Sequence, residues 1–227
     1  MSNPTDMDAA SDPSSPDGER GSVLRRPEVD LEIAPVDVVV FDLGNVLISW
    51  DPQPAVARAV GAEQAARFLA DESFAFGAWN NEQDAGRPWD KAVQIAVKEH
   101  PHWEPAIRGY REHFPDSLIG PIEDSVEILR ELHAAGIRLF ALTNWSSELF
   151  PAALSRFDFL SLFEDIIVSG EEGVRNPDPA IFEILTRRIR SHVARCYFID
   201  DSLENIRADT KSGREAILSS DTHMRRR

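Results

Sequence analysis

The 227-residue sequence has a single cysteine, Cys196, and no long apolar run. One cysteine excludes a disulfide within the chain, and because Cys196 stands in an apolar segment we interpret it as a buried, inert thiol. No segment approaches the roughly 20 apolar residues of a membrane helix, and the N-terminal residues contain no apolar core of a secretory signal. We therefore expect a cytoplasmic protein with no membrane partner.

Positive charge is also scarce, since 24 Lys and Arg residues stand against 39 Asp and Glu, for a formal net charge of −15. A nucleic-acid partner requires a surface rich in Lys and Arg, so this balance argues against one. The sequence does have a hydrophobic content of 42%. That content and the chain length are sufficient for one domain that carries an insertion.

The chain changes character near residue 36. Residues 1–35 lack aromatics and are rich in Ser, Asp, Pro and Gly, so we predict a disordered tail that cannot bury enough surface to fold. Beyond it, short apolar runs predict strands, and the segments between them have helical periodicity. The predicted strands are 37–42, 137–142, 164–168, 196–200 and 215–218. Strands that alternate with helices indicate a parallel sheet with right-handed crossovers.

The interval between the first two predicted strands is too long for one crossover, and it has helical character throughout. We interpret it as a helical domain inserted after the first strand, placed to cover the carboxyl edge of the sheet and to exclude water. The predicted fold is α/β, with a Rossmann-like parallel sheet core and a helical cap. Its parts are a core at 36–50 and 116–220, a cap at 51–115, and a flexible C-terminus at 221–227.

Two predicted strands end in carboxylates. The run Val38–Phe41 leads into Asp42, and the run Cys196–Ile199 leads into Asp200 and Asp201. Unbroken apolar runs are typical of strands buried on both faces, and open α/β sheets bind ligands at the carboxyl ends of such strands. Mg²⁺ prefers one or two carboxylates together with waters and a phosphate. The sequence therefore predicts a metal-assisted site where these carboxylates meet.

Four segments in this order resemble the haloacid dehalogenase (HAD) superfamily. They are Phe41–Val46, Ala141–Ser146, Val174–Pro179, and Phe198–Ser202 with Asn205. The resemblance covers roughly residues 36–220, and the helical insertion looks like the C1-type cap of that superfamily. The similar branch contains small-molecule phosphatases, with sugar phosphates among their substrates, and the cap segment 79–87 is similar to that branch as well.

The resemblance implies a Mg²⁺-dependent phosphatase that hydrolyses a small, sugar-phosphate-like metabolite through an aspartyl-phosphate intermediate. Asp42 is then the nucleophile. The metal is held by Asp42, Asp201 and the backbone carbonyl of Gly44. Asp200 is an alternative ligand or orients the others, and Asn205 helps to orient the ligands without binding the metal itself. A carboxylate nucleophile of this kind divides one difficult displacement into two easier steps.

The remaining implied contacts concern the substrate. Thr143 and Asn144 follow a predicted strand, and their hydroxyl, amide and backbone N–H groups are suited to phosphoryl oxygens. Gly44 borders the same phosphate, and Trp79 is a substrate contact expected near the mouth of the cleft. We expect a monomer or a homodimer.

Two positions depart from the family pattern. Gly44 stands where most phosphatases of the superfamily carry a second Asp, which acts as general acid and then as base. Asn176 stands where the family has a Lys, which balances the charge of nucleophile and phosphate. Arg175 is a candidate to supply that charge instead. For the missing acid, the cap offers four candidates by residue type alone: Glu82, Asp84, His100 and His102.

These departures leave two alternatives open. One is a catalytically weakened or non-catalytic binding or regulatory protein on a HAD scaffold, which Gly44 and Asn176 together motivate. The other is a 2-haloacid dehalogenase, which also uses a strand-end Asp nucleophile and needs no second Asp. Dehalogenation needs no metal, however, and so gives no reason for Asp200 and Asp201.

Overall fold

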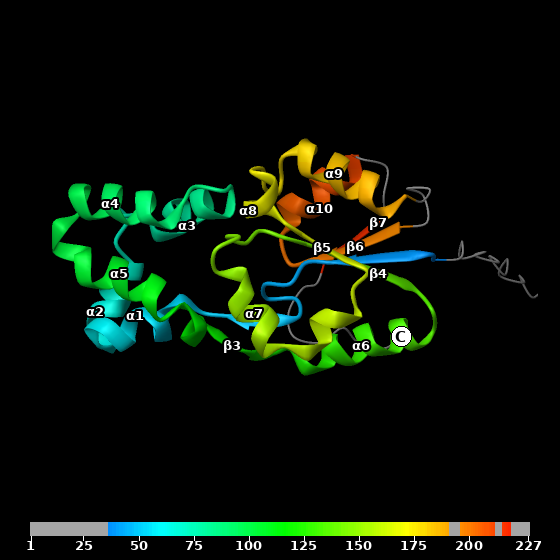
Figure 1. Cartoon of the computed structure of the whole chain (residues 1–227), viewed down its shortest axis with the longest axis horizontal. Helices are drawn as coiled ribbons and strands as arrows, with labels where there is room; N and C mark the ends of the chain where they lie inside the picture. The colour runs from blue at the N-terminus through cyan, green and yellow to red at the C-terminus, as the bar shows by residue number, and fades with distance from the viewer. Residues whose placement is uncertain (1–35, 191–195, 212–214, 219–227) are drawn as a thin grey trace, which may run out of the picture. The chain divides into compact units, whose positions relative to one another are not determined.

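A computed structural model describes residues 36–190, 196–211 and 215–218 of the chain (Figure 1). The predicted tail at 1–35 and the C-terminus at 221–227 lie outside the described residues. Five strands form one sheet in the order β5-β4-β1-β6-β7, and every pairing in it is parallel. Their bounds are β1 Val38–Phe41, β4 Arg138–Thr143, β5 Asp165–Val168, β6 Cys196–Asp200 and β7 Glu215–Leu218. The predicted α/β fold with a parallel sheet is confirmed.

The sheet is covered on both faces, as unbroken apolar strands require. Val39 and Phe41 of β1 point into one hydrophobic core, and Val38 and Val40 point into a second core on the opposite face. In Figure 1, helices α6 and α7 lie on one side of the sheet and α9 and α10 on the other. The bounds are α6 Glu123–Ala134, α7 Phe150–Arg156, α9 Pro179–Ile189 and α10 Leu203–Lys211. Cys196 is buried in the second core, as predicted.

Local chemistry fixes where the helices next to the site begin. Helix α9 starts after Asp178, whose carboxylate accepts the backbone N–H of Ala180 at 2.9 Å, and Pro179 occupies the first helical position. Both features are preferred at helix N-termini, where backbone N–H groups lack partners. A short helix, α8 (Ser169–Glu172), follows β5 directly. The chain thus runs from the carboxyl end of β5 through α8 and a loop into α9.

Five α-helices lie between residues 51 and 115, in the long interval that separates β1 from β4. They are α1 Pro52–Val60, α2 Ala62–Leu69, α3 Phe76–Asp84, α4 Trp89–Glu99 and α5 Glu104–Glu112. Aromatic rings hold them together: Phe76 and Tyr110 pack edge to face with centroids 5.0 Å apart, and Trp79 meets Trp89 at 5.3 Å. We propose the range 51–115 as a cap on this basis. None of the described helices has the length and apolarity to cross a bilayer.

The structure contains a small second sheet that the sequence pattern does not predict. Strands β2 (Ile48–Trp50) and β3 (Leu118–Pro121) pair antiparallel where the helical segment leaves the core and returns to it. Strands of three or four residues are too short to show a period of two, so their pattern does not stand out in the sequence. This pairing brings Trp50 to the edge of the site.

Candidate functional site

The central strand places Asp42 at the carboxyl edge of the sheet. β1 lies between β4 and β6, with Phe41 opposite both Ala141 and Ile199. The backbone N–H of Asp42 donates to the carbonyl oxygen of Ile199 at 2.8 Å, which continues the ladder by one residue. Asp42 and Asp200 therefore lie beside each other as the next residues of neighbouring strands. The sequence prediction that these two strand ends adjoin is confirmed.

Three carboxylates gather at this edge. Asp42, Asp200 and Asp201 each present a carboxylate oxygen within 4.8 Å of the others. Burial raises the pKa of Asp42 well above its ordinary value, and the negative charge of Asp200 raises it further. Burial likewise raises the pKa of Asp200 to about 6. Oxygen donors this close repel one another unless a cation lies between them, so the donor set fits a hard divalent ion.

The three carboxylates are not equivalent. Asp200 is fully buried, and its oxygens accept from Asn205 Nδ2 at 3.0 and 3.2 Å and from the backbone N–H of Ser202 at 2.6 Å. Asp42 and Asp201, in contrast, border the open cavity. This arrangement suits Asp42 and Asp201 as direct ligands of a cation. Asp200 and Asn205 are then placed behind them, where hydrogen bonds hold the ligands in orientation.

A tight turn follows Asp42. Asn45 adopts the left-handed backbone region with φ of 55°, which Asn tolerates better than most residues. Its side-chain oxygen accepts the backbone N–H of Trp50 at 3.2 Å, and its own N–H donates to the carbonyl of Ile48 at 2.8 Å. Gly44 borders the cavity beside Asp42. The turn thereby directs the chain from β1 into the short strand β2.

Thr143 and Asn144 stand at the end of β4, next to Asp42. The hydroxyl of Thr143 hydrogen-bonds the carboxylate of Asp42, which lowers its pKa. The side chain of Asn144 is already engaged, because its Oδ1 accepts the N–H of Asn176 at 2.8 Å and its Nδ2 donates to the carbonyl of Asn176 at 3.2 Å. Asn144 thus joins the end of β4 to the loop before α9.

The buried amide of Asn176 lacks partners. The residue is 1% exposed, and within the described part of the chain neither Nδ2 nor Oδ1 of its side chain makes a hydrogen bond. Buried polar groups in proteins are nearly always paired. Asn176 does not line the cavity, and it is joined to the site through the bonds between its backbone and Asn144.

Arg175 does not take the place of the family's Lys in this structure. Its guanidinium donates to the carbonyl oxygen of Asn176 at 2.8 Å, and the residue does not line the cavity. Its positive charge acts on Asp84 and lowers the pKa of that carboxyl. The geometry therefore leaves the carboxylate cluster without a side-chain cation from this loop.

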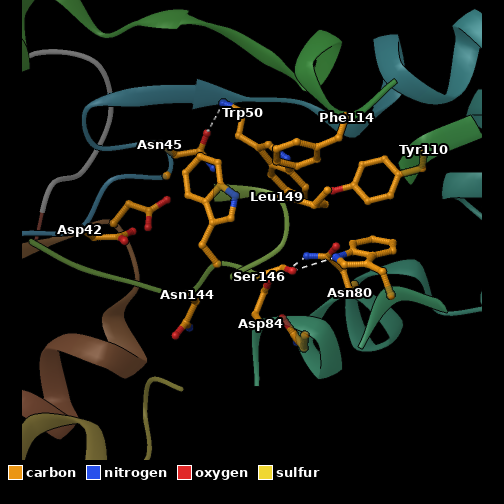
Figure 2. Close-up of a pocket in the computed structure, with 16 residues that line it drawn as sticks. Asp42, Asn45, Trp50, Asn80, Asp84, Tyr110, Phe114, Asn144, Ser146 and Leu149 are labelled. Atoms are coloured by element: carbon orange, nitrogen blue, oxygen red, sulfur yellow. Dashed lines mark hydrogen bonds between the residues drawn. The ribbon is translucent and has the colours of Figure 1, made fainter. Parts of the chain in front are cut away.

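A cavity of about 270 Å³ opens above the carboxylates (Figure 2). Its walls come from both the core loops and the cap helices, and Figure 2 shows Asp42 and Asn45 on one side and Tyr110, Asn80 and Phe114 on the other. The residues along it are Asp42, Gly44, Asn45, Trp50, Gly77, Asn80, Asn81, Asp84, Trp89, Tyr110, Phe114, Asn144, Trp145, Ser146, Leu149 and Asp201.

Hydrogen bonds hold the cap over this cavity. The indole N–H of Trp89 donates to Ser146 Oγ at 2.8 Å, and its backbone N–H donates to Glu148 at 2.8 Å. The hydroxyl of Ser169 donates to the backbone carbonyl of Asp84. Trp89, Ser146 and Ser169 are buried. The helical segment therefore meets the core through specific contacts next to the cavity.

Several residues expected at the site lie elsewhere. Trp79 does not line the cavity: it is 9% exposed and packs within the aromatic core of the cap, with its indole N–H facing the carbonyl of Ala92 at 3.5 Å. Glu82, His100 and His102 do not line it either. The sequence predicts Trp79 near the cleft, and this is wrong because sequence alone does not determine which way a helix is rotated about its axis. The cap tryptophan that does border the cavity is Trp89.

Asp84 is the candidate acid of the cap that does reach the cavity. It is 8% exposed, and its carboxylate accepts from Asn80 Nδ2 at 3.1 Å and from the backbone N–H of Ser146. Burial raises the pKa of Asp84 to about 7, although Arg175 and Ser146 act in the opposite direction. In the sequence, Asp84 is a candidate acid by residue type alone. The packing of α3 against the core places Asp84, and not Glu82, at the cavity.

Comparison with known proteins agrees with this geometry. The family model of haloacid dehalogenase-like hydrolases matches residues 36–209. The chain is 25% identical to the sesquiterpene phosphatase astK of Aspergillus oryzae over 184 residues, which cover 81% of this chain and 89% of that protein.

It is also 25% identical to the drimenol cyclase drtB of Aspergillus calidoustus over 185 residues. That match covers 81% of this chain, which spans only about a third of the cyclase, 34% of its length.

A solved structure supports the fold. A HAD family enzyme from Bacteroides thetaiotaomicron, crystallised as a mutant with magnesium and inorganic phosphate, superimposes with a TM-score of 0.64 at 17% identity. The match covers 82% of this chain and 96% of that chain. The family model covers most of the chain, including Asp42, Thr143 and Asp201, and so the chain belongs to the haloacid dehalogenase-like hydrolases.

Proposed function

We propose that this hydrolase is a Mg²⁺-dependent phosphatase that acts on a small phosphate monoester. The observation that carries the proposal is the cluster of Asp42, Asp200 and Asp201, whose oxygens lie within 4.8 Å of one another beside a cavity. The name of the fungal relative, a sesquiterpene phosphatase, supports the reaction type. The related Bacteroides fold was crystallised with magnesium and inorganic phosphate.

In this proposal Asp42 is the nucleophile. Its carboxylate oxygen would form a bond to phosphorus while the bond from phosphorus to the ester oxygen breaks. The alcohol leaves with a proton from water, and the hydroxide so formed takes up the proton that the attacking water loses in the next step. A second water then attacks phosphorus, which releases inorganic phosphate and restores the Asp42 carboxylate. The hydroxyl of Thr143 orients Asp42 through the hydrogen bond between them.

Asp42, Asp201 and the carbonyl of Gly44 would hold Mg²⁺, with Asp200 and Asn205 behind them. A bound cation supplies positive charge that lets two anions, the carboxylate and the phosphate, approach each other. This need is pronounced here because no Lys, Arg or His borders the cavity in the part of the chain that the structure describes. Asn176 stands at the position of the family's Lys, but it does not line the cavity, so its buried amide would reach the phosphoryl group only after its side chain moves.

The two alternatives have less support. A 2-haloacid carries a carboxylate and releases a halide, and the described lining offers no cation for either. A non-catalytic binding protein would be consistent with Gly44 and Asn176. It gives no role, however, to the Asp42 carboxylate, which Thr143 and the pairing of β1 hold in place.

Release of inorganic phosphate from an aryl phosphate tests the proposal. The wild type should hydrolyse it with Mg²⁺ and lose the activity in EDTA, and Asp42→Asn should be inactive with the metal present. Asp158→Asn is the matched control, because this acid is 93% exposed on the surface of the core and should retain wild-type rates. Activity in Asp42→Asn close to that of the control would refute the proposed nucleophile.

A further inference from the structure

The part of the cavity beyond the carboxylates is lined by apolar side chains. Figure 2 shows Trp50, Leu149, Phe114 and Tyr110 grouped on the side of the cavity away from Asp42. Trp50 comes from β2, Leu149 from the loop before α7, and the other two from the end of the cap. Aromatic and aliphatic walls bind ligands mainly by removing apolar surface from water. The alcohol part of the ester lies in this region if its phosphoryl group lies at Asp42.

Three of the polar side chains along the cavity, Asn45, Asn144 and Ser146, already hydrogen-bond the protein itself. Asn45 Oδ1 accepts the N–H of Trp50, and Ser146 Oγ accepts the indole N–H of Trp89. Both ends of the Asn144 amide bind the backbone of Asn176. A ligand with several hydroxyl groups would therefore find few free partners among these side chains, and each unpaired hydroxyl in a buried site costs binding free energy.

The indole N–H of Trp145, which belongs to the cavity wall, is buried and, within the described part of the chain, unpaired. Trp145 is 7% exposed, and its indole N–H has no hydrogen-bond partner among the described residues. An unpaired buried N–H is unfavourable in a folded protein.

The charges along the cavity further restrict the class of substrate. Asp42, Asp84 and Asp201 border the cavity, and none of its described lining residues is a Lys, Arg or His. A second anionic group on the substrate would lie among carboxylates without a counterion. A cationic group is also less suited, because the oxygens of Asp84 already accept from Asn80 and Ser146, and Arg175 lies close enough to affect this carboxyl.

We propose that the substrate is the phosphate monoester of a compact, uncharged alcohol with an apolar body, held by Trp50, Tyr110, Phe114, Trp145 and Leu149. This assignment rests on the proposed phosphatase function and differs from the sugar-phosphate-like substrate expected from sequence. The cavity of about 270 Å³ is close to the lower end of the roughly 300–1,000 Å³ typical of small-molecule sites. A compact alcohol of one ring or a short branched chain suits that volume.

Two pairs of esters matched in shape test the assignment. Cyclohexylmethyl phosphate and glucose 6-phosphate are both primary esters next to a six-membered ring, and 3,3-dimethylbutyl phosphate is the uncharged isostere of phosphocholine. The apolar member of each pair should have the higher kcat/KM, by roughly 10- to 100-fold. A higher value for glucose 6-phosphate would instead assign the site to sugars, and a higher value for phosphocholine would assign it to an aromatic cation site. Either result overturns the proposal.

Binding separates this inference from the reaction. Calorimetric titration with the phosphonate analogues of the same two pairs, with Mg²⁺ present, measures the preference of the cavity whether or not an ester is cleaved. Tighter binding of the apolar phosphonates without any hydrolysis would refute the phosphatase function and leave the ligand class standing. Equal or weaker binding of the apolar phosphonates would refute the ligand class.

A charge placed in the wall provides a second test. Leu149→Lys should lower kcat/KM for cyclohexylmethyl phosphate by roughly 10-fold or more and raise it for phosphoglycolate, whose alcohol part is anionic. Leu149→Ser, which needs less space, should lower the first value without raising the second. Leu154→Lys is the control, because Leu154 is 52% exposed on the following helix. An unchanged preference in both Leu149 variants would contradict the proposed wall.

Discussion

The buried carboxyl of Asp84 should make the stability of this protein depend on pH in a specific way. Its pKa is raised from 3.8 to about 7, mainly by burial, so the folded protein holds a proton that the unfolded chain releases at lower pH. A group with a raised folded-state pKa stabilises the fold most below its unfolded pKa, and this contribution is lost as pH rises through the folded pKa. Between pH 4 and pH 7, Asp84 therefore makes the free energy of unfolding fall.

The magnitude follows from the two pKa values. Each pKa unit corresponds to about 1.4 kcal/mol, so the full loss is on the order of 4 kcal/mol, of which about 2 to 3 kcal/mol falls between pH 5 and pH 8. Asp84→Asn removes the titration while keeping the side-chain shape. Relative to the wild type, the variant should therefore gain about 2 to 3 kcal/mol of stability from pH 5 to pH 8.

Urea unfolding at pH 5 and pH 8, with EDTA in every sample, measures this difference. Any fixed cost of the substitution is the same at both pH values and cancels, as do all titrations that the two proteins share. Glu82→Gln is the matched control, since Glu82 lies on the same helix and is exposed. If Asp84→Asn differs from the wild type by the same amount at both pH values, the reasoning about this carboxyl is wrong.

Three further changes have expected outcomes. Asp201→Ala should abolish or strongly weaken Mg²⁺ binding in calorimetric titration. Mg²⁺ should also raise the melting temperature of the wild type but not of the variant. Equal Mg²⁺ binding by both proteins would show that Asp201 is not a ligand. Asn176→Lys should raise kcat/KM roughly 10- to 100-fold because it adds a charge beside the carboxylates, whereas Arg175→Ala should leave the rate nearly unchanged; a severe loss in the Arg175 variant would show that this guanidinium already supplies the charge. Gly170→Ala should destabilise the protein by about 1–3 kcal/mol in urea unfolding, because its Cβ would lie 2.6 Å from the backbone N of Ser147 and 2.7 Å from the carbonyl of Trp145; wild-type stability would contradict the packing of this loop.

The strand-end carboxylates could be predicted because local sequence decides them. An apolar run in the sequence predicts both a strand and the position of its carboxyl end. Asp42 and Asp200 stand at the carboxyl ends of two such runs. The order of segments then brings both ends to the same edge through parallel pairing. No knowledge of side-chain packing was needed for this step.

The walls of the cavity could not be predicted in the same way. Trp79 and Trp89 both belong to cap helices rich in aromatics, yet Trp79 faces the cap interior and Trp89 borders the cavity. Which face of a helix meets the core depends on contacts between distant segments, such as the bond from Trp89 to Ser146. That the indole N–H of Trp145 is buried and unpaired among the described residues likewise becomes known only from the residues packed around it.

The central claim is that Asp42 carries the phosphoryl group during turnover. Rapid acid quench of the enzyme with Mg²⁺ and an aryl phosphate, followed by borohydride reduction and peptide mass spectrometry, measures it directly, because reduction converts an aspartyl-phosphate to homoserine. We expect homoserine at position 42, dependent on both substrate and metal and missing in Asp42→Asn. Phosphate release without modification of Asp42, or modification of a different carboxylate, would contradict the account.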